Sequence, residues 1–114
     1  MKDDRLYLVH ISECITRIEE YTDGKEQKDF LDSYLIQDAV LRNLQVLAES
    51  TQRLSPEIKN AHPDIPWRQI AGFRNILVHD YLGINLKQIW LLVEKDLPDL
   101  ISKIDVMRRE LGAE

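Results

Sequence analysis

The chain has 114 residues, of which 44% are hydrophobic and 31% are charged, so it has enough apolar material for one core and enough charge for a solvated surface. Its net charge of -5 argues against a generally basic nucleic-acid binder, so any binding of RNA would have to depend on a local cluster of positive charge. No apolar run approaches the ~20 residues that span a bilayer, and the N-terminus has no leader pattern, so we expect one domain over residues 1–114 without a membrane segment.

The first predicted helix begins at Asp3 or Asp4, either of which can cap it, and runs to about Tyr21, where the turn at residues 22–24 ends it. Its apolar face contains Cys14, which we interpret as a buried small hydrophobe rather than a nucleophile. A single cysteine cannot form an internal disulfide, so it indicates a reducing, cytoplasmic compartment. The other members of this face recur at helical spacing: Tyr7, Ile11, Ile15 and Ile18.

The next predicted elements are a short helical piece from Glu26 to Leu31 and a long helix from about Tyr34 to Arg53. The long helix has apolar stripes on two sides, which is typical of a helix covered on both sides in a bundle. Its polar residues Arg42, Asn43 and Glu49 form a solvated edge with ion pairs, or else Arg42 or Asn43 supports the His79 region from this neighbouring helix.

The stretch from Glu57 to Ile65 is polar, and we predict an irregular segment there. His62 should be exposed in this segment, because the proline that follows it disfavours helix. Pro66 suits the first position of a third helix, where its missing N–H costs nothing, and Gly83 should end that segment.

Asn85 can cap a fourth helix, and Pro98 should restart the chain as a last helix. Apolar residues repeat at helical spacing through both segments, and no strand-like alternation occurs. The sequence therefore predicts an all-α protein, an up-and-down bundle of four to five helices joined by short turns.

The end of the third predicted helix carries side chains that suit phosphodiester chemistry. Arg74, His79 and Tyr81 lie within eight residues, between apolar flanks. Arginine neutralises phosphate oxygens with a planar fork of donors, and histidine moves protons near neutral pH. Tyr81 would return to nearly the direction of Arg74 on a helix, so it could equally be a core residue at the helix end.

The same helix is predicted to have a polar face. At 100° per residue, Arg68, Gly72, Asn75 and His79 fall within about 60° of one another. Glycine inside a helix costs ~1 kcal/mol relative to alanine, so Gly72 indicates either the close approach of another backbone, such as a second subunit, or a solvated face that tolerates it. Arg74 lies about 140° from His79 on a regular helix. Both can reach one phosphate from one side only if the helix breaks before His79 or the site takes groups from two chains.

A ribonuclease without a metal needs a base for the ribose 2′-hydroxyl, an acid for the leaving 5′-oxygen and positive charge beside the phosphorane. One chain supplies one suitable histidine here, so such an enzyme would need a symmetric dimer with two His79 and two Arg74 around one cleft. The three histidines, His10, His62 and His79, lack the paired spacing of zinc ligands, and no glycine-rich phosphate loop is present, so we expect no metal site and no cofactor.

The pattern of an arginine, a polar residue, three residues, a histidine, one residue and a tyrosine resembles the signature of the HEPN domain. More narrowly, it is similar to the HepT-like toxins of prokaryotic toxin–antitoxin pairs. The residues Arg74, Asn75, His79 and Tyr81 match the motif, and the similar block extends from about residue 64 to 98, with helices that fit over essentially the whole chain. Outside the motif, Ala48 stands where a glycine is expected before the glutamate of the second long helix.

This resemblance implies a small metal-independent endoribonuclease that acts as a homodimer. By the same resemblance, Arg74 would stabilise the scissile phosphate, His79 would carry out the acid–base step, and Asn75 would help to orient the site. Tyr81 would accept AMP from a nucleotidyltransferase antitoxin of the MntA type, and the added group would block RNA by bulk and charge. The chain would then be the toxin component of a type VII-like toxin–antitoxin pair, with an RNA such as tRNA or mRNA as its substrate.

HEPN domains also serve as accessory modules, so the fold alone does not establish catalysis. The alternative is a non-catalytic helical adaptor, or substrate-binding partner, of a nucleotidyltransferase, whose acidic surface meets a basic partner protein. A plainer option is a helical scaffold in which Arg74 and His79 pair with acidic residues.

Overall fold

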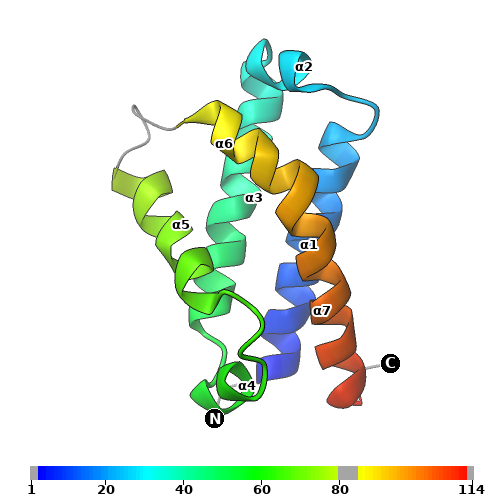
Figure 1. Cartoon of the computed structure of the whole chain (residues 1–114), viewed down its shortest axis with the longest axis vertical. Helices are drawn as coiled ribbons and strands as arrows, with labels where there is room; N and C mark the ends of the chain where they lie inside the picture. The colour runs from blue at the N-terminus through cyan, green and yellow to red at the C-terminus, as the bar shows by residue number, and fades with distance from the viewer. Residues whose placement is uncertain (1–2, 80–84, 113–114) are drawn as a thin grey trace.

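The computed structural model describes residues 3–79 and 85–112, and within residues 74–79 it describes the backbone but not the side chains. Every regular element in these two ranges is a helix. Four long rods run alternately up and down, as the sequence predicted, and two short helices lie at opposite ends of the bundle (Figure 1). The long elements are α1 (Asp4–Thr22), α3 (Tyr34–Gln52), α5 (Trp67–His79) and the rod formed by α6 (Leu86–Leu91), the π-helical turn η2 (Leu92–Asp96) and α7 (Leu97–Glu110); the short helices are α2 (Gln27–Leu31) and α4 (Pro56–Ala61).

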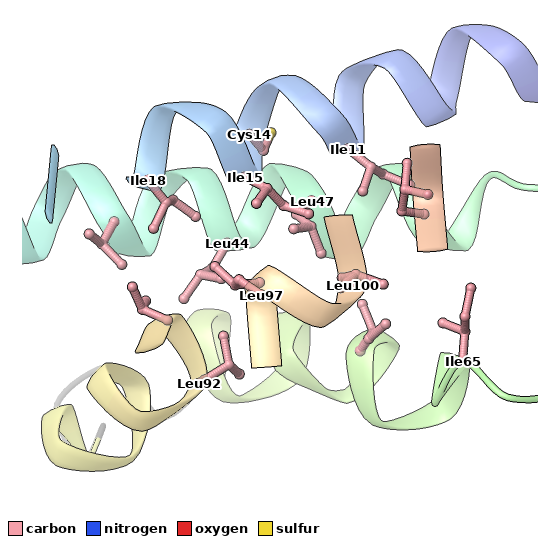
Figure 2. Close-up of a cluster of buried hydrophobic side chains, with 14 of the residues drawn as sticks. Ile11, Cys14, Ile15, Ile18, Leu44, Leu47, Ile65, Leu92, Leu97 and Leu100 are labelled. Carbon is pink, nitrogen blue, oxygen red and sulfur yellow. The ribbon is translucent and has the colours of Figure 1, made fainter. Parts of the chain in front are cut away.

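The core lies between α1, α3 and the α6–α7 rod (Figure 2). Cys14 is 2% exposed among these side chains, which confirms its interpretation as a buried hydrophobe. Burying side chains of this size stabilises the fold by about 1.5–3 kcal/mol each relative to leaving them in water. The fully buried members include Ile11, Ile15, Ile18, Val40, Leu44, Leu47, Leu97 and Ile104.

N-cap side chains determine where the long elements begin. The carboxylate of Asp3 accepts hydrogen bonds from the N–H groups of Arg5 and Leu6, at 3.1 and 3.4 Å, and so begins α1. The hydroxyl of Ser33 accepts from the N–H of Ile36 at 3.2 Å and begins α3. The side chain of Asn85 does the same for α6, as the sequence predicted.

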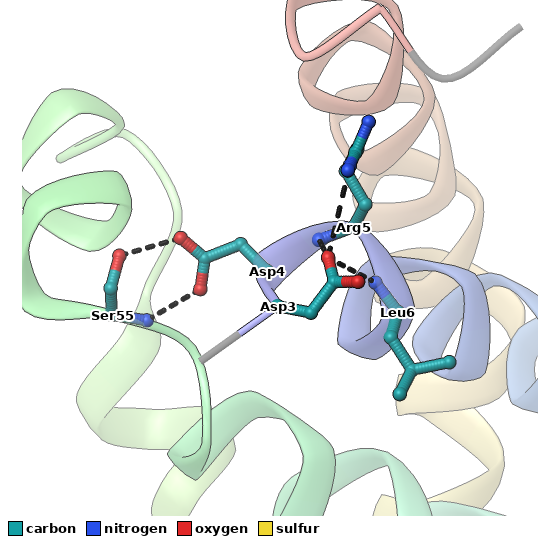
Figure 3. A network of polar contacts seen from close by, with 5 residues as sticks. All are labelled: Asp3, Asp4, Arg5, Leu6 and Ser55. Atoms are coloured by element: carbon teal, nitrogen blue, oxygen red, sulfur yellow. Dashed lines mark hydrogen bonds and ion pairs between the residues drawn. The ribbon is translucent and has the colours of Figure 1, made fainter. Parts of the chain in front are cut away.

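The segment predicted to be irregular contains a helix, because α4 covers Pro56–Ala61. The hydroxyl of Ser55 accepts from the N–H of Ile58 at 3.3 Å and caps it. Asp4 at the start of α1, distant in sequence but adjacent in space, then fixes the cap, since its two carboxylate oxygens accept from the N–H and the hydroxyl of Ser55 at 2.8 and 2.6 Å (Figure 3). The prediction missed this helix because the residue that stabilises its cap, Asp4, lies 51 residues away in the sequence.

His62 is not the exposed loop histidine that the sequence predicted. Its side chain is 19% exposed, and its Nε2 lies 3.1 Å from a carboxylate oxygen of Glu110 on α7. The indole N–H of Trp67 donates to the carbonyl oxygens of Lys59 and His62 at 3.1 and 3.0 Å. The segment between α4 and α5 is therefore held by contacts to α7, through Glu110, and to α5, through Trp67.

Pro98 does not restart the chain, because α6, η2 and α7 form one continuous rod (Figure 1). Proline has no N–H for the carbonyl four residues earlier, and its ring crowds that carbonyl in a regular α-helix. The wider π-helical turn lies directly before it, and the N–H of Leu97 donates to the carbonyl of Leu92, five residues back. The expanded turn therefore lets the helix continue past Pro98 where an α-helix would kink or end.

Candidate functional site on helix α5

The start of α5 is packed against the bundle. Helix α5 packs along α3, and Ile70 is 3% exposed and faces the core. Pro66 lies one residue before the first helical residue, Trp67, which agrees with its predicted role at the helix start to within a residue. The N-terminal half of α5 therefore forms a fixed support for the residues that follow it.

Helix α5 continues without a break to His79. The helix break that the sequence analysis left open is therefore absent. Positions 74 and 79 remain about 140° apart around the helix axis. If both residues act on one phosphate from one side, the two groups must come from different chains.

Measured from the buried Ile70, position 79 lies about 180° away, on the outward side of α5, whereas position 74 lies about 40° away, on the side that faces the bundle. Arg68 and Gly72 belong to the outward side, and Arg68 is exposed. Apart from its two chain neighbours and the nearby backbone of its own helix, no described atom lies within 4 Å of the place where a Cβ on Gly72 would stand. Packing within the described chain therefore does not require glycine there.

The structure places the predicted site residues only in part. Arg74, Asn75 and His79 belong to α5, but their side chains lie outside the described part of the structure, as does the whole of Tyr81. Their roles stay predictions.

The neighbouring helix α3 gives little direct support to this site in the part that the structure describes. The side-chain amide of Asn43 donates to the carbonyl of Ala39 in its own helix at 2.9 Å. Arg42 is exposed. Both observations favour a solvated edge of α3 over a role in supporting the His79 region.

The other two histidines have structural contacts. His10 packs its ring edge-on against Tyr7, with ring centroids 6.3 Å apart, and His62 lies against Glu110. Among the described residues, no group of three His, Cys, Asp or Glu side chains could hold a metal ion. In the same ranges, no helix is long and apolar enough to cross a membrane.

Sequence reasoning missed a groove beside α5. Its walls come from residues 66–73 on one side and residues 92–103 on the other, and helical periodicity alone could not bring these two segments together. The apolar spacing at Ile70 and Phe73 was the only local signal of it, and that spacing was read as core.

The sequence profile of the ribonuclease HepT-like family matches residues 11–107, a span that reaches from α1 into α7. The chain belongs to the ribonuclease HepT-like family. Its resemblance to HepT-like HEPN proteins is thereby confirmed, and the all-α bundle agrees with it.

Several curated proteins are similar to this HepT-like chain. A "probable ribonuclease HepT" of Thermococcus cleftensis is 37% identical over 103 residues, which cover 90% of this chain and 94% of that protein. A "gamma-glutamylcyclotransferase and putative RNase" of Methanocaldococcus jannaschii is 40% identical over 96% of this chain, which spans only 50% of that protein. An "mRNA nuclease HepT" of Shewanella oneidensis is 29% identical, over 88% of this chain and 92% of that protein. No solved structure matches the chain.

Proposed function

We propose that this chain is a metal-independent endoribonuclease that works as a symmetric homodimer, with Arg74 and His79 at a cleft between the two subunits. The observation that carries the proposal is the family match over residues 11–107, which includes the whole of α5. The relatives named as ribonucleases support RNA as the substrate, and the one named as an mRNA nuclease supports mRNA as the class.

In this proposal His79 moves the protons. One copy takes the proton of the ribose 2′-hydroxyl, and the other gives a proton to the leaving 5′-oxygen. Arg74 neutralises the charge that develops on the phosphorane, and Asn75 orients the site. The regular course of α5 supports a shared site, because positions 74 and 79 of one helix point about 140° apart.

The proposal extends to the control of the enzyme. Tyr81 lies two residues beyond His79 in the sequence, and AMP transferred to its hydroxyl would bring phosphate charge and an adenosine group to the cleft. A nucleotidyltransferase antitoxin would transfer the AMP from ATP to the tyrosine oxygen and release pyrophosphate. The chain would be the toxin of a type VII-like pair in the cytoplasm.

The test is to express the wild-type chain, Arg74→Ala and His79→Ala without the antitoxin, and to follow growth and RNA integrity. Exposed Arg17 on α1 and half-buried His10 provide matched control variants, Arg17→Ala and His10→Gln, because each lies on α1, away from α5. We expect the wild type and both controls to cleave RNA with chelator present and the two site variants to lose cleavage. Equal behaviour of wild type and site variants would contradict the enzyme proposal.

The same chains can be mixed with a nucleotidyltransferase of the MntA type. An adaptor would form a complex with that enzyme while leaving RNA intact, both before and after AMP transfer. A toxin would cleave RNA until Tyr81 is modified, and Tyr81→Phe would remain active in the presence of the antitoxin and ATP.

A further inference from the structure

A groove runs between the N-terminal half of α5 and the rod formed by η2 and α7. Its floor consists of buried apolar side chains, Ile70, Leu97 and Leu100, which are 3%, 1% and 8% exposed. Its polar wall on the rod carries Asp96, Asp99 and Lys103. The groove therefore joins an apolar floor to a charged edge.

The charged edge is acidic. The ammonium group of Lys103 lies 3.2 Å from Asp99 and 3.6 Å from Asp64, so it is already engaged by two carboxylates. The hydrogen bond to Asp99 raises the pKa of Lys103, which keeps it charged in this setting. Asp96 is exposed, and its carboxylate makes no hydrogen bond or ion pair with any described residue. Three carboxylates against one ammonium leave a net charge of two negative at this edge.

The size of the groove limits what it can hold. Its volume is about 140 Å³, close to the roughly 150 Å³ of an engineered cavity that accommodates one benzene molecule. Binding sites for whole cofactors or drug-sized molecules begin at about 300 Å³. The groove therefore suits a single side chain from a larger partner.

We propose that this groove receives an arginine side chain from a basic segment of a partner protein. The methylene groups of the arginine would lie on the apolar floor, and its guanidinium would donate to the free carboxylate of Asp96. Gln69 lines the same groove and offers a side-chain oxygen to the remaining donors. The acidic edge repels RNA, so this site is distinct from the proposed RNA-cleaving face of α5 and does not depend on it.

The test uses the whole chain and two synthetic peptides, acetyl-Leu-Arg-Leu-amide and the same peptide with citrulline, which has the shape of arginine without its charge. Binding is measured by chemical-shift titration at low and high salt. We expect only the arginine peptide to bind, with shifts at Ile70, Phe73 and Leu100, and its affinity to fall with salt.

Two carboxylates in η2 provide a matched pair of variants. Asp96→Asn should lower the affinity of the arginine peptide by about three- to tenfold. Glu94→Gln should leave this affinity unchanged, because Glu94 is exposed outside the groove. Lys103→Met should strengthen binding, since it removes the cation that competes for Asp99. Failure of the wild type to bind the arginine peptide, equal binding of the citrulline peptide, or equal effects of Asp96→Asn and Glu94→Gln would each overturn the proposal.

Discussion

At the scale of single residues, Cys14 combines a reactive group with a buried position on α1. Burial is the main cause that raises the pKa of its thiol; Glu13 acts in the same direction, and Arg17 and Arg42 oppose it. We predict that iodoacetamide alkylates Cys14 slowly at pH 8 in the folded protein and completely in denaturant, because the thiolate is the nucleophile. Mass spectrometry after timed quenching measures both rates.

The same raised pKa links stability to pH. The folded chain holds the thiol proton more tightly than the unfolded chain, so this contribution to stability is present below the ordinary thiol pKa and is lost as pH rises through the higher folded value. The free energy of unfolding should therefore fall more steeply above about pH 9 for the wild type than for Cys14→Ala. The free energy of unfolding is measured by urea titration at pH 8 and pH 10. An equal change between the two pH values in the wild type and in Cys14→Ala would contradict this prediction.

Arg68 is exposed on the outward side of α5, and among the described residues it makes no ion pair. Position 68 lies about 16 Å along the axis from position 79, so Arg68 would contact a phosphate other than the scissile one. We predict that Arg68→Ala weakens the binding of RNA and lowers the salt slope of binding by about one. Binding is measured in a His79→Ala background, which prevents cleavage. Arg17→Ala on α1 is the control. An equal loss of RNA affinity in Arg68→Ala and Arg17→Ala would argue against a specific phosphate contact from Arg68 on α5.

At the scale of elements, Gln37 joins α2 to α3. It is 7% exposed, and its side-chain amide donates to the carbonyl oxygens of Phe30 and Leu31 at 3.0 and 3.1 Å. These carbonyls end α2, where intrahelical partners are missing. We predict that Gln37→Leu lowers the free energy of unfolding by about 1–3 kcal/mol, because it leaves the carbonyl of Leu31 without this donor.

Urea unfolding measures the change, and Gln52→Leu is the control, since Gln52 is exposed at the end of the same helix. An equal loss of stability in Gln37→Leu and Gln52→Leu would show that the hydrogen bonds of the buried Gln37 amide add no stability of their own.

The elements that could be predicted are those whose beginnings depend on neighbours in the chain. Asp3 and Asn85 each cap a helix by bonding N–H groups two and three residues ahead, and a local pattern reveals such bonds. The contacts that were missed link distant segments. Helix α4 depends on Asp4, and His62 depends on Glu110, so no window around either segment contains its partner.

Pro98 illustrates a different limit. Its chemistry was read correctly, because proline does oppose a regular α-helix at that point. The structure accommodates Pro98 with a π-helical turn at residues 92–96 and does not begin a new helix there. Local sequence does not separate these two outcomes, since both satisfy proline, and burial of Leu92 and Val93 in the continuous rod favours the second.

The helix that carries the candidate site could be predicted, since Trp67–His79 is helical, but the roles of Arg74, Asn75 and His79 stay predictions. Gly72 was the one mid-helix signal that called for another backbone, and the structure leaves open space beside it. A single chain cannot reveal what approaches that position. The predicted second subunit therefore stays a prediction, which belongs to the scale of the whole molecule.

At that scale, the regular course of α5 makes a specific demand on a catalytic dimer. If each half of the shared cleft pairs Arg74 of one subunit with His79 of the other, neither Arg74→Ala nor His79→Ala alone can assemble a complete pair. A mixed dimer of the two variants would keep one complete pair, with Arg74 from one chain and His79 from its partner, and the other half of the cleft would have neither residue. We predict that mixing the two inactive variants restores part of the RNA cleavage, at less than the wild-type rate per dimer because only one of the two proton-transferring His79 side chains is present.

The mixed dimer is purified through two different affinity tags, and cleavage of a fluorescent RNA is measured against each parent dimer. A mixed dimer of wild type with the double variant Arg74→Ala, His79→Ala is the control, because each Arg74–His79 pair formed across its two subunits lacks one of the two residues. Activity in that control together with an inactive mixture of the single variants would place both residues of a working site in one chain. The same result would require α5 to change course before His79 when RNA binds, because the regular helix holds these two positions about 140° apart.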